Sequence, residues 1–234
     1  MALPKSSATP AARRRQPKRL LQKNLPRNSP LKSRLPTRKT SAKSSNSKNS
    51  FLFLSFMRLF VAVDFPDSLK KYLSEVGTSL KNDAADVAVA REHHLTLKFL
   101  GEQSENYAAE LERRLSRVSF KPFEARLTKI GTFGDGKTVR VVWGGIEPVA
   151  PFAALAKEID KATPEVKDTY PEYTPHITFA RVKHIIAKEA FNELLKRTKL
   201  EEKSFAVREF KLYRSVAGQE GHRYQVLATF PAKA

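Results

Sequence analysis

The feature that most constrains the fold of this 234-residue chain is an internal repeat. The stretch HLTLKFL begins at His94, and the similar stretch HITFA begins at His176, 82 residues later. The helical patterns that follow begin near residues 104 and 187, and the next strand-like patterns begin near 122 and 204. A repeat of this kind organises a whole fold rather than one element. Each half reads as a helix, a His-x-Thr strand, a helix and a hairpin.

The repeat predicts an α+β fold with two similar lobes, related by a pseudo-twofold axis. Each half can form a small antiparallel sheet flanked by helices. The two His-x-Thr strands would then face each other across an active-site cleft. A first strand is expected in RLFVAVDF (58–65). The apolar run from 51 to 63 is too short to span a bilayer, and a signal-peptide core is the alternative to a strand there.

The other elements are predicted from apolar periodicity and from helix-capping residues. Pro66 opens an amphipathic helix, Ser104 caps a helix that extends to about 118, Pro151 opens a third helix, and a fourth lies near 187–198. Strands are expected from about 122 and 137, joined by the glycine-rich turn GTFGDG. Two more are expected in SFAVREFKLY (204–213) and RYQVLATF (223–230).

The His-x-Thr stretches place an imidazole and a hydroxyl on the same face of a strand. Residues i and i+2 of a strand point to the same side, so His94 lies beside Thr96, and His176 beside Thr178. The apolar residues between them point to the opposite side. Each lobe is therefore expected to bury its apolar row and to present one His-Thr pair.

Two such pairs suit the cleavage of a phosphodiester. In-line displacement at phosphorus needs a base for the attacking water and an acid for the leaving oxygen, on opposite sides of the phosphate. Histidine serves both roles near neutral pH, and Thr hydroxyls can donate to the non-bridging oxygens. This chemistry needs no metal, and no cofactor is expected.

Other readings of the histidines are less specific. Five histidines should give about 0.3 His-x-Thr motifs by chance, so two motifs alone are weak evidence of a functional site. Their equivalent positions in a repeat strengthen that evidence. The alternative is a pair of histidines that belong to the core. Strand parity turns His93 towards the packed side or the strand edge, without a catalytic role. His184 and His222 lie among polar residues and are expected to be solvated. The histidines lack partners at zinc-ligand spacing, and the absence of Cys excludes disulfides, thiolate sites and a thiol nucleophile.

Five motifs together resemble those of a known family: MRLFVAVDFP (57–66), HLTLKFLGE (94–102), VRVVWGGI (139–146), YTPHITFAR (173–181) and YQVLATFP (224–231). The resemblance is to the RNA 2′,3′-cyclic phosphodiesterases, formerly 2′-5′ RNA ligases (LigT-like), of the two-histidine (2H) phosphoesterase superfamily. It runs from Met57 to the C-terminus. It implies a bilobal fold and hydrolysis of RNA 2′,3′-cyclic phosphate ends to 2′-phosphate. Some members also join tRNA halves reversibly through a 2′-5′ bond.

The resemblance also implies roles for individual residues. His94 is similar to the general acid that protonates the departing 3′ oxygen, and His176 to the base for water, although the residues allow the reverse. Thr96 and Thr178 resemble the phosphate donors, and Arg181 resembles the family's phosphate-binding arginine. Simple parity would place Arg181 opposite His176, so the strand must end or bulge before it, or the side chain must reach round.

The segment 1–56 differs sharply in charge from the rest. It holds 14 Lys and Arg and no Asp or Glu, which leaves +5 of the formal +19 on the other 178 residues. It lacks the apolar content to fold and is expected to be disordered, with the phosphoesterase domain at 57–234. A basic RNA-binding arm, an organellar transit peptide and an over-extended gene model are the alternatives for it. A cytoplasmic location is otherwise expected.

The expected partner is RNA with 2′,3′-cyclic phosphate ends, tRNA halves among them. The protein is expected to be a monomer and not to associate with a membrane. Two other functions compete with an RNA cyclic phosphodiesterase. One is a non-catalytic module that binds RNA ends, and the presence of both His and both Thr favours the enzyme over it. The other is a related esterase for ADP-ribose 1″,2″-cyclic phosphate, which the motifs do not separate from the first.

Overall fold

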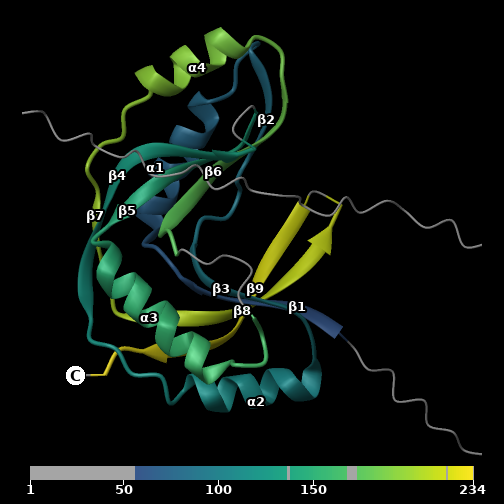
Figure 1. Ribbon diagram of the computed structural model, residues 1–234, viewed down its shortest axis with the longest axis vertical. Helices are drawn as coiled ribbons and strands as arrows, with labels where there is room; N and C mark the ends of the chain where they lie inside the picture. The colour runs from purple at the N-terminus through teal and green to yellow at the C-terminus, as the bar shows by residue number, and fades with distance from the viewer. Residues whose placement is uncertain (1–55, 136–137, 168–172, 220, 234) are drawn as a thin grey trace, which may run out of the picture. The chain divides into compact units, whose positions relative to one another are not determined.

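The structure is a computed structural model that describes residues 56–135, 138–167, 173–219 and 221–233 (Figure 1). Apart from Phe56, the basic segment predicted to be disordered lies outside these residues. Four helices and nine strands are found in the described ranges. The helices are α1 (Asp67–Ser79), α2 (Glu105–Leu115), α3 (Val149–Ala162) and α4 (Lys188–Arg197).

The strands form two antiparallel sheets. The four-stranded sheet contains β1 (Phe56–Val63), β3 (Leu95–Ser104), β8 (Glu209–Gly218) and β9 (Gly221–Pro231), in the order β3-β1-β8-β9. The five-stranded sheet contains β2 (Ala85–Val89), β4 (Phe123–Gly134), β5 (Val139–Glu147), β6 (His176–Ile185) and β7 (Ser204–Val207), in the order β2-β6-β5-β4-β7. Every strand pair is antiparallel, which confirms the α+β class.

The prediction that each half builds its own sheet is wrong. The hairpin of β4 and β5 lies beside β6 from the second half, and the hairpin of β8 and β9 lies beside β1 from the first (Figure 1). Two equivalent orders result, β3-β1-β8 and β6-β5-β4. Pro66 before α1 and Pro148 before α3 are 82 residues apart, so β5 takes the place of β1 in the repeat. Each sheet therefore combines strands from both halves.

Three further elements differ from the predictions. The stretch SFAVREFKLY forms two strands, because the chain leaves the five-stranded sheet after Val207 and enters the four-stranded sheet at Glu209. Helix α3 begins at Val149, and Pro151 is accommodated in its first turn, where backbone N–H groups have no helical acceptor. Strand β2, at the edge of the five-stranded sheet, was not predicted.

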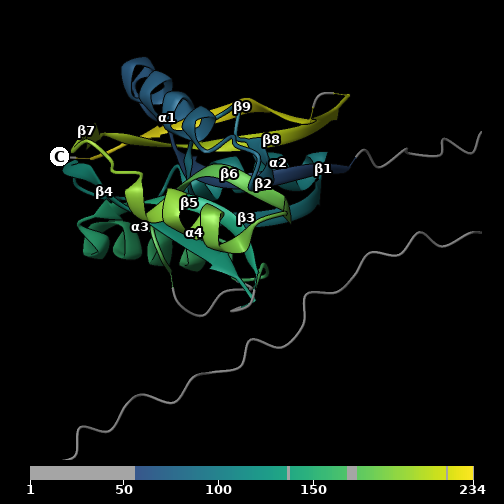
Figure 2. The ribbon, with the colours of Figure 1, turned by 90° about the horizontal axis from the view of Figure 1, so that it is seen from above.

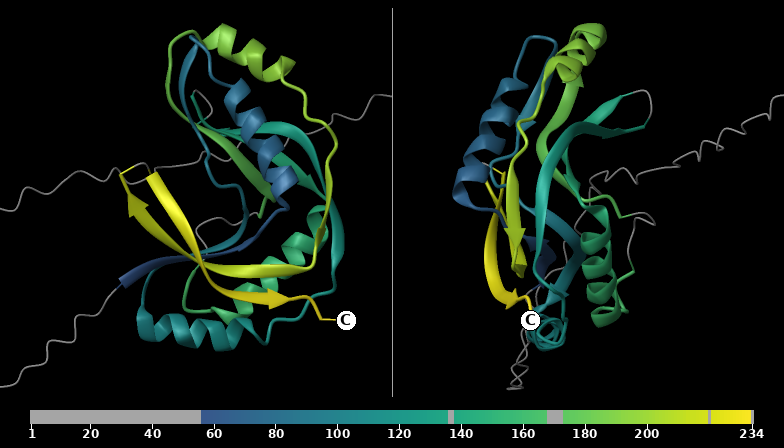
Figure 3. Two further views of the ribbon diagram at one scale, coloured as in Figure 1. Left: turned by 180° about the vertical axis from the view of Figure 1, so that it is seen from behind. Right: turned by 90° about the vertical axis from the view of Figure 1, so that its left-hand side faces the viewer.

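The helices cover the sheets with the apolar faces that the sequence predicts. Leu69, Leu73 and Val76 of α1 are buried, and α1 packs on β6 and β2. Ser104 caps α2 by accepting a hydrogen bond from the Tyr107 amide at 3.3 Å, as predicted. Helices α2 and α3 pack on β3, and α1 and α3 lie on opposite sides of the described fold (Figures 2 and 3). No helix within the described ranges is long and apolar enough to cross a membrane.

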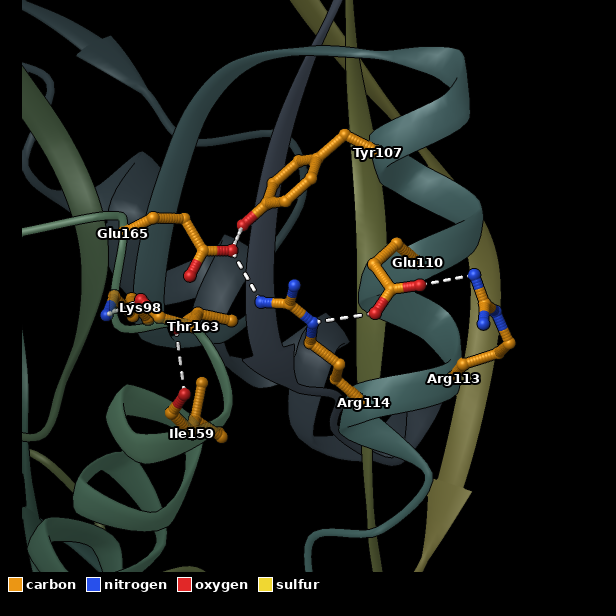
Figure 4. Close-up of polar contacts among 8 residues, drawn as sticks. All are labelled: Lys98, Tyr107, Glu110, Arg113, Arg114, Ile159, Thr163 and Glu165. Atoms are coloured by element: carbon orange, nitrogen blue, oxygen red, sulfur yellow. Dashed lines mark hydrogen bonds and ion pairs between the residues drawn. The ribbon is translucent and has the colours of Figure 1, made fainter.

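A buried lysine fixes β3 to the end of α3. Lys98 is 4 % exposed, and its ammonium group lies 2.6 Å from the Asp160 carboxylate. It also lies 3.3 Å from the carbonyl oxygen of Thr163, which is drawn with Lys98 in Figure 4. A positive charge is favourable at a helix C-terminus, where the last carbonyl groups have no helical donor. Next to it, Glu165 accepts hydrogen bonds from Tyr107 and Arg114 of α2. These contacts hold α2, α3 and the strand that carries Thr96 together.

Candidate active site

The two His-x-Thr pairs lie as strand parity predicts. Thr96, on β3, and Thr178, on β6, are half-buried, and so are His94, directly before β3, and His176, the first residue of β6. The alternating residues Leu95, Leu97, Ile177 and Phe179 are all buried in the core. Each strand therefore turns its apolar row inwards and its His-Thr pair to the other side.

A β-bulge brings Arg181 to the face of His176. In the pairing of β5 with β6, Trp143 pairs with Thr178 and Val142 with Ala180, so Phe179 is the extra residue. Phe179 and Ala180 are both fully buried, and Arg181 is exposed. A bulge shifts the alternation by one residue, so Arg181 rejoins the side of Thr178. The sequence left three explanations for the position of Arg181: a strand end, a bulge or a side chain that reaches round. The structure shows a bulge.

Each histidine lies against aromatic rings from its own sheet. The ring centre of His94 is 4.9 Å from that of Phe60 and 4.9 Å from that of Tyr224, whose ring is perpendicular to it. The ring centre of His176 is 4.8 Å from that of Phe133 and 5.8 Å from that of Trp143. These rings remove water from the imidazoles without offering them a charge.

Burial lowers the pKa of both imidazoles. For His94 the main cause is loss of hydration, followed by the charge of His93. Asp64 acts in the opposite direction, and Arg181 and His176 lower the pKa further, to about 4. Loss of hydration also lowers the pKa of His176, with Arg181 contributing in the same direction. Coulombic interactions weaken with distance. His94, His176 and Arg181 therefore share one electrostatic environment, although they come from two strands.

Two hydrogen bonds link the chain segments that carry the pairs. The Tyr173 hydroxyl, ahead of β6, donates to the Thr96 carbonyl oxygen at 3.1 Å. The Nδ1 atom of His93, ahead of β3, lies 3.4 Å from the Thr178 carbonyl oxygen. In each case a residue ahead of one His-x-Thr pair, His93 by one position and Tyr173 by three, binds the backbone of the threonine in the other. This reciprocal link fixes the spacing between the two pairs.

The comparisons with known proteins agree with this geometry. A family model described as the 2′-5′ RNA ligase superfamily matches residues 65–219. The chain belongs to this RNA 2′,3′-cyclic phosphodiesterase and 2′-5′ RNA ligase family. It is 33% identical over 188 residues to the RNA 2′,3′-cyclic phosphodiesterase of Archaeoglobus fulgidus, covering 74% of this chain and 99% of that protein.

Further relatives of this phosphodiesterase family match over a similar length. The RNA 2′,3′-cyclic phosphodiesterase of Methanocaldococcus jannaschii is 30% identical over 175 residues, with 73% of this chain and 98% of that protein covered. The crystal structure of E. coli LigT in apo form superposes with a TM-score of 0.61 at 26% identity, covering 76% of this chain and 99% of LigT. The fold is thus shared with LigT over almost the whole of that protein.

Several residues that contact the two His-Thr pairs or their strands could not be predicted from the sequence. His93 is on the packed side, as predicted, but its two partners were not foreseen: besides Thr178, its Nε2 atom lies 3.0 Å from the Ser74 hydroxyl. The Tyr173 link and the aromatic rings beside the histidines were also missed, because they come from distant parts of the chain. His184 and His222 are exposed, as predicted. In the part of the chain that the structure describes, no three His, Asp or Glu side chains group as metal ligands would.

Proposed function

We propose that residues 57–234 form a metal-independent phosphodiesterase, which hydrolyses RNA 2′,3′-cyclic phosphate ends to 2′-phosphates. The observation that carries this proposal is the pair of hydrogen bonds that links the two His-Thr pairs, from Tyr173 to the Thr96 carbonyl oxygen and from His93 to the Thr178 carbonyl oxygen. The charge of His176 also contributes to the lowered pKa of His94. Arg181 acts on both. In our proposal the substrate phosphate binds in a cleft between the two lobes, with one His-Thr pair on each side.

His176 serves as the general base. Its Nδ1 atom lies 2.7 Å from the Thr174 carbonyl oxygen. A carbonyl oxygen only accepts hydrogen bonds, so Nδ1 of the neutral ring carries the proton and Nε2 keeps its lone pair. The lowered pKa favours this neutral form. Nε2 takes a proton from the attacking water as the new bond between the water oxygen and phosphorus forms.

His94 serves as the general acid on the opposite side of the phosphate. As the bond between phosphorus and the 3′ oxygen breaks, His94 gives its proton to that oxygen and becomes neutral. The ring is returned to its starting form by a proton from solvent, and His176 loses its extra proton in turn. The products are a 2′-phosphate and a free 3′-hydroxyl.

Thr96, Thr178 and Arg181 hold the phosphate. The two hydroxyls donate hydrogen bonds to the non-bridging oxygens, and they are directed at the atoms on which negative charge grows in the transition state. Arg181 supplies a permanent positive charge beside them, because a guanidinium group stays protonated at every working pH. The bulge at Phe179 is what makes Arg181 available on this side.

The relatives support the choice of substrate. The proteins of Archaeoglobus fulgidus and Methanocaldococcus jannaschii are named RNA 2′,3′-cyclic phosphodiesterases, and E. coli LigT has been crystallised with 3′-AMP, a ribonucleotide with its phosphate on the ribose. If the 5′-hydroxyl of a second RNA replaces water as the nucleophile, the same acid and base produce a 2′-5′ bond. Reversible joining of RNA ends, tRNA halves included, therefore follows from the same site.

The proposal is tested by incubating the purified chain with an RNA oligonucleotide that ends in a 2′,3′-cyclic phosphate, in the presence of EDTA. We expect complete conversion to the 2′-phosphate, detected by phosphorus NMR. A strict requirement for added Mg²⁺ or Mn²⁺ would contradict the two-histidine mechanism. Binding of the RNA without turnover would show a module that only holds RNA ends. Faster turnover of ADP-ribose 1″,2″-cyclic phosphate would redirect the substrate.

A further inference from the structure

A carboxylate lies at the end of β1, on the side of the four-stranded sheet that carries His94. Asp64 follows β1 directly, two residues after the fully buried Ala62, and its side chain is 24% exposed. Residues two apart in an extended chain share a face, so Asp64 continues the row of Phe60 and Ala62. The ring of Phe60 contacts that of His94. The carboxylate therefore belongs to the same face of the sheet as the proposed general acid.

Two lysines and one backbone amide bind the Asp64 carboxylate. Its Oδ1 atom lies 2.7 Å from Nζ of Lys70 in α1 and accepts a hydrogen bond from the Phe65 amide at 2.9 Å. Its Oδ2 atom accepts a hydrogen bond from Lys211 of β8 at 2.9 Å. Burial opposes the charged form, but these partners outweigh it and lower the pKa of Asp64. The carboxylate is therefore charged at neutral pH.

Tyr213 of β8 connects this carboxylate with His94. Its ring stacks on Phe60 with the ring centres 5.1 Å apart, and its ring centre is 6.2 Å from that of His94. Burial raises the pKa of Tyr213, and the charge of Asp64 and a hydrogen bond to it act in the same direction. Protein groups screen a charge less than water does. The charge of Asp64 therefore reaches the imidazole across a layer of aromatic rings.

The titratable groups around His94 act on it in opposite directions. They are His93 beside it, Asp64 after β1, His176 and Arg181 of β6, Tyr213 of β8 and Tyr224 of β9. The two tyrosines stay protonated, mainly because burial raises the pKa of both hydroxyls. The two other histidines and the arginine lower the pKa of His94, whereas Asp64 raises it.

The equivalent position in the other half of the repeat carries no charge. Pro148 corresponds to Pro66, so the residue equivalent to Asp64 is Ile146, 82 positions later, which is buried. The pKa of His176 is lowered by burial and by Arg181, against the Thr174 carbonyl group. The lobe of His94 thus has a negative charge where the lobe of His176 has an apolar side chain.

We infer that Asp64 is the counter-ion of the general acid, and that its charge favours the protonated form of His94. This inference rests on the proposed function, in which His94 gives a proton to the departing 3′ oxygen. Asp64 acts through His94 and is a positioning residue. Lys70 and Lys211 hold the carboxylate in place and at the same time weaken its effect. The asymmetry between Asp64 and Ile146 assigns the acid to His94 and the base to His176.

The test measures the pKa of His94 in the full chain, by NMR titration of the imidazole Cε1–H signal. His94→Ala assigns this signal by its loss. Asp64→Asn keeps an oxygen that can accept the Phe65 amide and deletes the charge, so the pKa of His94 should fall. Asp64→Glu should restore most of it. Lys70→Met removes a positive charge from Asp64, and it should raise the pKa of His94.

The same variants are compared in the hydrolysis of adenosine 2′,3′-cyclic phosphate at pH 7.5. Above the maximum of the pH profile, kcat/KM follows the protonated fraction of the acid. We expect Asp64→Asn to lower kcat/KM about 5-fold, in line with the loss of one charge several Å away in a partly hydrated site. Lys70→Met should raise kcat/KM, a result that structural damage does not produce.

Asp67→Asn is the matched control, because Asp67 lies in the first turn of α1, is exposed and is 3.9 Å from the same Lys70. It should leave the pKa of His94 unchanged. An unchanged pKa of His94 in Asp64→Asn, or an equal fall in Asp67→Asn, overturns the counter-ion while the hydrolase stands. A loss of kcat/KM at constant pKa overturns it as well. If the wild-type chain does not hydrolyse the cyclic phosphate, the proposed function fails instead, and the NMR titration still decides whether Asp64 acts on His94.

Discussion

At the scale of single residues, the orientation of the His176 imidazole is held by a hydrogen bond to the backbone. The Thr174 carbonyl oxygen, two residues earlier in the chain, fixes the proton on Nδ1 and so directs Nε2 outwards. His94 depends instead on its aromatic neighbours, Phe60 and Tyr224, which lower its pKa by excluding water. The two histidines thus have unequal surroundings, which suits unequal roles.

Replacing either histidine with alanine should reduce kcat by about 100-fold or more, because each variant removes one proton-transfer partner. The double variant should be little worse than the poorer single one, since the two act as a unit. His184→Ala, a change at an exposed histidine, is the control and should keep full activity. Near-wild-type turnover in His94→Ala or His176→Ala would exclude the mechanism.

The link between the two pairs can be tested at Tyr173. Tyr173→Phe removes only the hydroxyl that binds the Thr96 carbonyl oxygen. We expect kcat to fall by about 10-fold, because small errors in position cost rate, while stability falls by about 1 kcal/mol or less. Steady-state kinetics and thermal unfolding measure the two effects separately.

Tyr107→Phe is the matched control for that change. It removes another tyrosine hydroxyl, the one that binds Glu165 in the contacts between α2 and the segment after α3 (Figure 4). Its stability loss should be similar and its kcat unchanged. If both variants lose kcat equally, Tyr173 has no special effect on the spacing of the two pairs.

At the scale of elements, Lys98 determines how β3 sits on α3. Lys98→Met keeps the apolar stem and deletes the charge, which leaves the buried Thr163 carbonyl group without this donor. The loss of its ion pair costs the Asp160 carboxylate less free energy, because this group is partly exposed and water can hydrate it in place of the lysine. We expect the free energy of unfolding to fall by about 1–3 kcal/mol, the cost of an unsatisfied buried acceptor.

Lys161→Met provides the comparison for Lys98→Met in urea unfolding. Lys161 pairs with Glu158 on the exposed side of the same helix, and such surface pairs contribute about 0–1 kcal/mol. Equal losses in the two variants would show that burial of Lys98 adds nothing to its contact with α3.

At the scale of the whole molecule, the electrostatics of the site should appear in the pH dependence of turnover. The base must be neutral and the acid protonated, whichever histidine takes each role. Because both pKa values lie below the usual 6.5, with that of His94 at about 4, the bell-shaped profile of kcat/KM should have its maximum below pH 6.5 and fall above it.

The kcat profile should lie at higher pH than the kcat/KM profile. A bound phosphate anion favours the protonated imidazole and so raises both pKa values in the complex. Initial rates from pH 4 to 9 in buffers of constant ionic strength measure both profiles. A kcat/KM that stays flat from pH 5 to 8 would contradict the lowered pKa values.

The domain boundary belongs to the same scale. A chain that starts at Met57 retains both His-Thr pairs, Arg181 and every strand of the two sheets except the first residue of β1. We expect it to fold and to hydrolyse adenosine 2′,3′-cyclic phosphate at the rate of the full chain. Loss of this activity, with circular dichroism showing an unfolded chain, would move the boundary towards the N-terminus.

Much of the local structure could be predicted from the sequence, because local periods decide it. The parity of His94 and Thr96, the apolar face of α1 and the cap at Ser104 depend on residues within a few positions of one another. The position of Arg181 was also constrained, since its motif conflicted with strand parity. The strand had to end or bulge before it, or the side chain had to reach round, and only the structure shows that the strand bulges at Phe179.

The sequence by itself determined that two His-Thr pairs exist, on which face of its strand each lies, and that the halves correspond. The tertiary structure alone decided which strands pair. A repeat shows only that two segments are alike, and the edge of an antiparallel sheet can pair with the equivalent strand of either half. The exchange of β4 and β8 between the two sheets therefore leaves no signal in the local sequence. The same holds for the contacts of His93 and Tyr173 and for the rings that lower the pKa of His94. Each depends on groups that approach only when the whole chain has folded.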